Sequence, residues 1–310
     1  MAPGASAPGA GYAPPMIDWT PSSIAIQLGP LGIPWYGLGY AVAIGFGVWL
    51  AGVQARRRGL DPAFIGDALI WVIALGIIGA RLYHVIDQWQ LYQDDLLKIV
   101  LPPYSGLALY GGVGGGIVGV LVATRRRGQS FLTWADVAIP SLFFGQAIAR
   151  WGNFFNQELY GPPTNLPWGI AIQCGHRVQA YLCPPGSDPL ATLGQHFHPL
   201  FLYESSLTLV GGVLALWASR RLAVRLRDGD LLSFWFIWYG ALRALLEPFR
   251  SPDSQGLIGI PVVIGIGAAV ILLGVGSIAW RHRRPGRDAP SEMPPEEVAP
   301  PVPVETPPPG

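Results

Sequence analysis

Two short stretches of the chain place arginine, glutamate and amide side chains next to apolar runs. The first, RWGNFFNQELYG, covers residues 150–161 and contains Arg150, Asn153, Glu158 and Gly161. Ionisable side chains at membrane depth are costly, and they normally face the protein interior or a watery cavity. Arg150 and Glu158 are therefore the first candidates for a functional site.

The second stretch, YGALRALLEPFRSPD, covers residues 239–253. Tyr239, Arg243 and Glu247 are four residues apart, so they share one face of a helix. The plainer explanation is a pair between Arg243 and Glu247 that makes a buried arginine tolerable. The functional explanation is that this face meets Arg150 on the same side of a membrane.

Two converging arginines suit an anionic, oxygen-rich headgroup, because each guanidinium offers a planar fork of donors that matches phosphate. A phospholipid phosphate is the ligand expected at that depth. Glu158 and Glu247 can hold the arginines through hydrogen bonds, or one of them can act as a general base. The residues alone do not choose between these roles.

Three further polar side chains lie near the expected outer ends of apolar runs. Tyr36, in PWYGLGY, is either an interfacial aromatic or a hydroxyl of the site. Arg81 either reaches the headgroups from the second run or binds the ligand. Glu204, in HPLFLYE, enters the fifth run from outside and can line the same cavity.

The cysteines and histidines suggest no metal or nucleophile chemistry. Cys174 and Cys183 are free to pair or to stay reduced, and neither sits beside a set of residues that would activate a thiol. The five histidines show no metal-ligand spacing. We expect no metal and no cofactor.

The composition indicates the class of protein. Hydrophobic residues make up 51% of the 310 residues and charged residues 13%, against roughly 25% charged in a typical soluble domain. The mean hydropathy is +0.37 and the net charge is +1. We predict an all-α polytopic membrane protein that does not bind nucleic acid, since no basic soluble face is evident.

Seven apolar runs of about 20 residues match the roughly 30 Å of a bilayer core. They start near Trp35, Phe64, Gly106, Thr133, Pro199, Leu231 and Leu257. Arginine clusters follow the first, third, fifth and seventh runs, at 56–58, 125–127, 220–227 and 281–284. Because cytoplasmic loops hold the excess of Lys and Arg, the clusters predict seven transmembrane helices with the N-terminus outside and the C-terminus cytoplasmic.

The domain organisation follows from these runs. Residues 21–284 form the membrane domain, and residues 153–198, between the fourth and fifth spans, form a small extracytoplasmic cap. Residues 1–20 and the Pro-rich residues 285–310 are expected to be disordered tails.

Glycines crowd the third run, at positions 111, 112, 114, 115, 116 and 119. Close packing of helices is the plainer explanation of this crowding. Room for a lipid chain or headgroup is the alternative.

RWGNFFNQELYG resembles the signature of the bacterial prolipoprotein diacylglyceryl transferases, approximately GRxGNFxNxExxG. Seven of the eight signature positions match, and Ala149 departs from the usual glycine. The resemblance continues from WYGLGY at Trp35, through HPLFLYE at His198, to the pattern ending at Asp253. Only the two tails fall outside it.

The resemblance implies a seven-span enzyme of the bacterial inner membrane, with its active site toward the outer leaflet. Such enzymes move the diacylglyceryl group of phosphatidylglycerol to the lipobox cysteine thiol of prolipoprotein signal peptides, forming a thioether and releasing glycerol 1-phosphate. Matching positions imply that Arg150 and Arg243 clamp the phosphate and that Glu158 and Glu247 orient them. They further imply roles for Asn153, Tyr36 and Tyr239 as hydrogen-bond partners of the lipid, and for Gly161 as a close turn past it.

One departure concerns the thiol-activating base. Many relatives carry a histidine before the paired glycines of the third span, where this chain has Tyr110. A tyrosine with a pKa near 10 is a poor base at neutral pH, so Tyr110 is expected to hydrogen-bond. Glu158, Glu247 and the bound phosphate remain candidates for the proton.

A transporter, lipid scramblase or lipid-binding membrane protein would share the spans and an arginine pair. Transporters often show paired repeats with interrupted spans, and this chain has no corresponding halves. A structural scaffold needs no two outward-facing Arg and Glu sets, so it ranks last.

Overall fold

The computed structural model describes residues 17–100, 106, 108–250 and 259–283. The side chains of residues 109, 110 and 259–262 are outside this description. The predicted tail segments 1–16 and 285–310 therefore lie outside the described residues, as do Asp253 and the expected start of the last span at Leu257.

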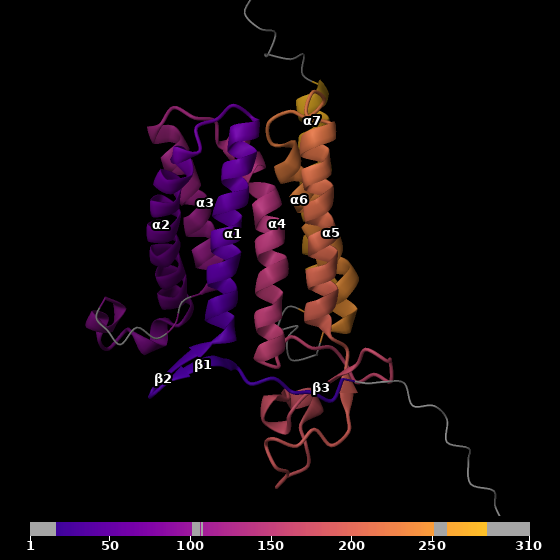
Figure 1. Cartoon of the computed structure of the whole chain (residues 1–310). Coiled ribbons are helices and arrows are strands. Elements are labelled where there is room, and N and C mark those ends of the chain that lie inside the picture. The colour runs from indigo at the N-terminus through magenta and orange to yellow at the C-terminus, as the bar shows by residue number, and fades with distance from the viewer. Residues whose placement is uncertain (1–16, 101–105, 107, 251–258, 284–310) are drawn as a thin grey trace, which may run out of the picture.

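Seven α-helices of 17–25 residues are present in the described residues and form an upright bundle (Figure 1). They are α1 (Trp35–Arg57), α2 (Ala63–Asp87), α3 (Leu109–Arg126), α4 (Phe131–Phe155), α5 (Leu200–Arg221), α6 (Asp230–Leu246) and α7 (Gly259–Arg283). Each begins within about three residues of a predicted run, because long apolar segments are marked off by charged and proline-containing loops.

Five of the helices, α1, α2, α4, α5 and α7, are long and apolar enough to cross a membrane. Their outward side chains fit a lipid environment: Ile70, Ile77 and Leu272 are 67%, 56% and 71% exposed. Continuous apolar surface of this kind is unusual on a soluble monomer. The helical fold with several candidate spans confirms the prediction of a polytopic membrane protein.

Short strands and 3₁₀ turns lie outside the α-helical bundle. β1 (Ile24–Leu28) pairs antiparallel with β2 (Leu31–Pro34), and β3 (Ile170–Ala171) pairs with β4 (His196–Phe197). The 3₁₀ turns are η1 (Trp89–Leu91), η2 (Leu96–Ile99), η3 (Cys174–His176), η4 (Gln179–Tyr181) and η5 (Glu247–Phe249). These elements are too short for sequence periodicity to reveal.

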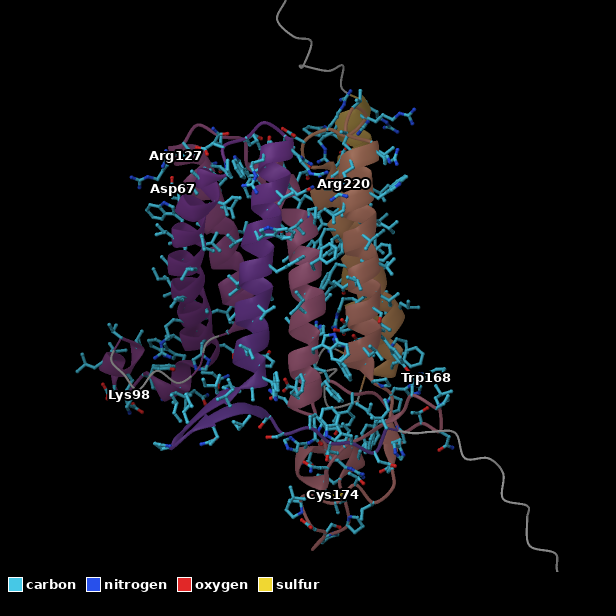
Figure 2. All side chains as sticks on the ribbon, viewed as in Figure 1. Asp67, Lys98, Arg127, Trp168, Cys174 and Arg220 are labelled. Atoms are coloured by element: carbon cyan, nitrogen blue, oxygen red, sulfur yellow. A yellow bond between two sulfur atoms is a disulfide. The ribbon has the colours of Figure 1, made fainter. Side chains whose placement is uncertain are left out.

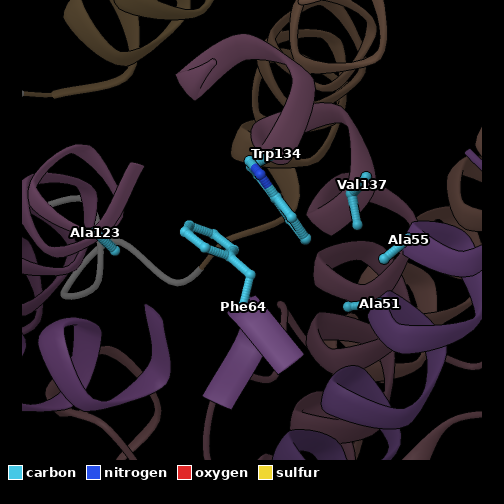
Figure 3. Close-up of a cluster of buried hydrophobic side chains, with 6 residues drawn as sticks. All are labelled: Ala51, Ala55, Phe64, Ala123, Trp134 and Val137. Carbon is cyan, nitrogen blue, oxygen red and sulfur yellow. The ribbon is translucent and has the colours of Figure 1, made fainter. Parts of the chain in front are cut away.

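The two ends of the bundle differ in charge and in architecture. Arg127 and Arg220 lie at one end, whereas Lys98, Trp168 and Cys174 lie at the other (Figure 2). Near the arginine-rich end, buried side chains from α1, α2, α3 and α4 pack together, with the rings of Phe64 and Trp134 4.2 Å apart (Figure 3).

Glycines bring α2 and α3 into backbone contact. A Cβ atom placed on Gly79 would lie 2.3 Å from the carbonyl oxygen of Gly111, and one on Gly115 would lie 2.0 Å from that of Leu75. The crowded glycines of the third run therefore serve close helix packing, at least along this face.

Residues 17–20, which the sequence assigned to the N-terminal tail, run beside the 153–198 insertion instead. The amide of Ile17 donates to the carbonyl of Gly169 at 3.0 Å, and the amide of Ala171 donates to the carbonyl of Ile17 at 2.9 Å. Ile17 is thus hydrogen-bonded to the insertion, and the extent of the N-terminal tail stays a prediction.

Candidate active site

Three helices bring the charged candidate residues together at the end of the bundle that carries the insertion. α4 ends there, α5 begins there, and α6 ends there before continuing as η5 (Figure 1). Pro199 precedes α5, and Pro248 lies in η5, so both helix boundaries fall at prolines. The helix ends thereby place polar side chains just outside the longest apolar stretches.

Five of these side chains form one continuous chain of alternating charge. Nε of Arg150 lies 2.6 Å from Oε2 of Glu204, and Nη2 of Arg250 lies 2.7 Å from Oε1 of the same carboxylate. Nε of Arg250 lies 3.6 Å from Oε2 of Glu247, which is 3.1 Å from Nη2 of Arg243. We call these five residues the arginine network.

Burial within the arginine network is graded. The side chains of Glu204 and Glu247 are 3% and 1% exposed, and that of Arg250 is 10% exposed. Arg150 and Arg243, at the two ends, are 33% and 25% exposed. With all five groups ionised, three cations face two carboxylates, so the network carries one net positive charge. Its two most exposed guanidinium groups are those of Arg150 and Arg243.

Glu158 is linked to Arg150 through the side chain of Asn153. Its Oε1 accepts from Nδ2 of Asn153 at 2.8 Å and from Nδ2 of Asn156 at 3.4 Å. Asn153 in turn accepts from Nη1 of Arg150 at 3.5 Å through its Oδ1. Glu158 thus reaches Arg150 through an amide, and the direct carboxylate partner of Arg150 is Glu204.

Tyr36 lies against the same end of α4. A Cβ on Gly152 would come within 2.6 Å of its ring, so this glycine allows α1 to approach. The hydroxyl groups of Tyr36 and Tyr40 are 3.2 Å apart. The predicted site hydroxyl is therefore one member of a tyrosine pair beside the arginine network.

Tyr239 and Gly161 each lie close along the chain or in space to a member of the network. The Tyr239 ring stacks on Trp235 with centroids 5.1 Å apart, one helical turn before Arg243. A Cβ on Gly161 would lie 2.6 Å from the carbonyl oxygen of Phe249. Gly161 thus permits a close contact between the insertion and the chain just before Arg250, whereas the resemblance implied a turn past lipid.

His198 fixes this junction from the α5 side. Its carbonyl accepts from the Gly161 amide at 2.9 Å, and its Nδ1 lies 3.1 Å from the Tyr203 hydroxyl. The Trp168 indole donates to the same hydroxyl at 2.7 Å (Figure 2 shows Trp168 beside the start of α5). Burial lowers the pKa of His198 below its usual value, which favours the neutral ring.

Arg81 is committed to a different part of the molecule. It donates to the Ile99 carbonyl at 3.0 Å, to the Tyr92 hydroxyl at 3.1 Å and to the Gly106 carbonyl at 3.2 Å. Lys98 of this loop lies on the opposite side of the bundle from Trp168 (Figure 2). The geometry places Arg81 in loop packing, and a substrate contact for it stays a prediction.

Two remaining sequence candidates have different outcomes. The Tyr110 side chain lies outside the described residues, so its expected hydrogen bond stays a prediction. Cys174 and Cys183 form a disulfide with Cα atoms 5.6 Å apart. Among the described side chains, no group of three or more His, Cys, Asp or Glu could hold a metal ion.

Comparison with known proteins identifies this arrangement. The family model described as prolipoprotein diacylglyceryl transferase matches residues 23–280 of the chain. The chain belongs to the prolipoprotein diacylglyceryl transferase family. The arginine network, the tyrosine pair and the Gly161 junction all lie inside the matched residues.

Curated members of this family cover most of the chain. A phosphatidylglycerol–prolipoprotein diacylglyceryl transferase of Symbiobacterium thermophilum is 39% identical over 270 residues, which is 86% of this chain and 96% of that protein. The Synechococcus elongatus transferase is 36% identical over 264 residues, covering 84% and 88%. That of Paenarthrobacter aurescens is 36% identical over 271 residues, covering 86% and 84%.

Within this diacylglyceryl transferase chain, Arg250 is the site residue that sequence reasoning missed. It lies three residues after Glu247 and seven after Arg243, so helical spacing places all three on one face. That spacing was available in the sequence. The pairing of Glu204 with Arg150 was not, because the two residues belong to different helices.

Proposed function

We propose that this transferase moves the diacylglyceryl group of phosphatidylglycerol to the lipobox cysteine of prolipoprotein signal peptides. Membership of the family and the substrates named for its curated members support the reaction. The observation that carries the assignment of the site is the arginine network, whose excess positive charge opens at Arg150 and Arg243.

The reaction is a displacement at carbon. The cysteine sulfur forms a bond to the glycerol CH₂ carbon of the diacylglyceryl group, and the bond between that carbon and the phosphate ester oxygen breaks. Glycerol 1-phosphate leaves with the electron pair of the broken bond, and the thiol proton passes to a base. Negative charge therefore grows on the phosphate as the bond breaks, and cations placed there lower the barrier.

Arg150 and Arg243 supply those cations in the proposed mechanism. Each has an exposed part and a carboxylate partner, Glu204 or Glu247, that holds the other part of the guanidinium. A guanidinium fixed in this way donates to phosphate oxygens without losing further side-chain freedom. Arg250 touches both carboxylates, so it is a positioning residue.

Burial narrows the choice of proton acceptor. Glu204 and Glu247 are nearly inaccessible, whereas Glu158 is exposed next to Asn153. The departing phosphate monoester is a second acceptor, since its second pKa is near 6. We propose that the proton goes to Glu158 or to the phosphate and that Tyr110 has a secondary, hydrogen-bonding role.

The proposed topology has seven spans, with the N-terminus outside and the C-terminus in the cytoplasm of a bacterium with the chain in its inner membrane. α3 and α6 contain 18 and 17 residues, or about 27 and 26 Å at 1.5 Å per residue, close to the bilayer core. The positions of Arg127 and Arg220 opposite the insertion support a cytoplasmic arginine-rich end (Figure 2).

This topology puts the arginine network at the outer leaflet. Residues 153–198 then form the extracytoplasmic cap on a membrane domain of residues 21–284. Lipid substrate reaches the network from the bilayer, and the signal peptide presents its cysteine from the same side.

Transfer of mass to a peptide tests the reaction directly. Purified protein is incubated with phosphatidylglycerol and a lipobox-cysteine peptide, and the peptide is weighed by mass spectrometry. We expect one added diacylglyceryl group per thiol and free glycerol 1-phosphate. Lipid binding without added mass would favour a transporter or lipid-binding protein and contradict the proposal.

Tyr110→Phe tests whether Tyr110 contributes less to catalysis than Arg243. We expect it to retain transfer within about tenfold of the unchanged protein, whereas Arg243→Ala should lose at least about 10²-fold, the cost of removing an electrostatic stabiliser. A loss for Tyr110→Phe as large as that for Arg243→Ala would make Tyr110 a principal catalytic residue.

A further inference from the structure

A cavity lies in the cap, outside the arginine network. Its volume is about 730 Å³, within the range of about 300–1,000 Å³ typical of ligand sites. One wall is residues 163–165, a second is residues 193–196, and the disulfide loop contributes residues 182–184. We call this cavity the cap pocket.

The walls of the cap pocket are the two chain segments that connect the cap to the arginine network. Residues 163–165 follow Gly161, and residues 193–196 lead into His198 and α5. The Thr164 amide donates to the His196 carbonyl at 2.9 Å and ties the segments together. Three residues span at most about 11 Å, so Thr164 is no farther than that from Gly161, which touches Phe249 beside Arg250.

The lining favours a polar, uncharged ligand. Thr164, Asn165 and Gln195 provide side-chain donors and acceptors. Nε2 of His196 is instead paired with Oδ1 of Asp18 at 2.8 Å. Arg177 also lines the pocket, but its guanidinium already donates to the Ile172 carbonyl at 3.2 Å and to Oε1 of Gln195 at 2.7 Å. A phosphate would need an open guanidinium fork, whereas peptide amides and carbonyls need only scattered hydrogen-bond partners.

The reaction determines which part of the substrate peptide lies near the cap. When the lipobox cysteine is at the arginine network, the apolar part of the signal peptide preceding it lies in the bilayer. The residues that follow the cysteine must leave on the side away from the bilayer, where the cap stands. At about 3.3 Å per extended residue, four to six residues cover about 13–20 Å, enough to reach from the network into the pocket.

Resting on the proposed function, we propose that the cap pocket binds the extended polypeptide segment immediately after the lipobox cysteine. Hydrogen bonds to its backbone would hold many different sequences, while the arginine network holds the lipid phosphate. The Cys174–Cys183 disulfide closes the loop that forms one wall, so it maintains the shape of the pocket.

Two lipobox peptides test the proposal with the full-length protein in phosphatidylglycerol nanodiscs. One ends a single residue after the cysteine, and the other continues for six polar residues. We expect the extension to lower KM by about tenfold, as a few net hydrogen bonds would, with little change in kcat. Equal KM values for the two peptides would overturn the proposal.

Two bulky substitutions test whether the lower KM of the longer peptide depends on the cap pocket. Asn165→Trp fills the pocket and should abolish the advantage of the longer peptide, whereas Gln179→Trp, at an exposed position outside the lining, should keep it. Transfer to the short peptide should persist in both variants. An unchanged advantage in Asn165→Trp would contradict the proposal and leave the proposed reaction intact.

Crosslinking provides a measurement that needs neither turnover nor a variant. A photoreactive residue is placed four positions after the cysteine, and the crosslinked protein is mapped by mass spectrometry. Crosslinks should fall in residues 163–165, 182–184 or 193–196. Crosslinks confined to the helices or to the β1–β2 ribbon would overturn the proposal, and failure of transfer with both peptides would instead contradict the reaction.

Discussion

Replacing Arg250 with methionine tests whether this residue positions the two outer arginines, because it leaves both of the proposed phosphate contacts, Arg150 and Arg243, in place. Methionine keeps the apolar stem to about the position of Nε but removes the guanidinium that joins Glu204 to Glu247. Glu204 would keep Arg150, and Glu247 would keep Arg243. The arginine network would then be neutral, and both buried carboxylates would have lost a partner.

Two magnitudes follow from this geometry. Removing one partner of a buried ion pair costs about 3–5 kcal/mol, so the free energy of unfolding should fall by a similar amount. Arg250 is one carboxylate away from each outer arginine, so a phosphate bound by those arginines would lie on the order of 8 Å from it. At an effective dielectric constant near 20, the lost attraction for the one further unit of negative charge that develops on the departing phosphate is about 2 kcal/mol, which corresponds to about a 30-fold lower kcat.

The assay combines peptide transfer with thermal unfolding in the same nanodiscs. Arg250→Met combined with Glu204→Gln removes the charge of one buried carboxylate that has lost one of its two arginine partners, so stability should recover in part. Activity should not recover, because Arg150 has then lost its partner. If Arg250→Met kept the melting temperature of the unchanged protein and a kcat within twofold of it, the argument that this residue organises the network would be refuted.

Two glycine substitutions test the backbone contacts. Gly79→Ala should destabilise the α2–α3 pair by about 1–3 kcal/mol, because its Cβ would lie 2.3 Å from the Gly111 carbonyl oxygen. The control Gly114→Ala, whose Cβ would have nothing within 4 Å, should leave the melting temperature unchanged. Equal shifts in melting temperature for the two variants would contradict the packing account. Gly161→Ala should lower transfer by about tenfold or more by pushing the cap away from Phe249, and transfer at the unchanged rate would show that this junction does not position the site.

The helices could be predicted from the sequence, because a bilayer imposes a length and a composition on each apolar run. Both arginines of the proposed clamp could also be predicted, because a charged side chain at membrane depth is costly and is therefore a candidate for a functional site. Glu247 was found from its spacing to Arg243 and does contact it at 3.1 Å.

The partners between helices could not be predicted in the same way. Glu204 pairs with Arg150 across two helices, and the sequence instead suggested Glu158, which is closer along the chain but reaches Arg150 only through Asn153. The short ribbons and the cap have no periodic pattern, because their shape depends on individual hydrogen bonds and on the disulfide. The sequence indicated four of the five charged residues of the network, all except Arg250, and only packing showed how they pair.

The most direct test of the phosphate clamp replaces each outer arginine by lysine, which keeps the positive charge and removes the planar fork. The measurement is kcat for diacylglyceryl transfer to a lipobox peptide by Arg150→Lys and Arg243→Lys, with Arg220→Lys at the opposite end of the bundle as the control (Figure 2). The clamp predicts losses of about 10²-fold or more for the first two variants and an unchanged rate for the control. Rates within about threefold of the unchanged protein for Arg150→Lys and Arg243→Lys would contradict it.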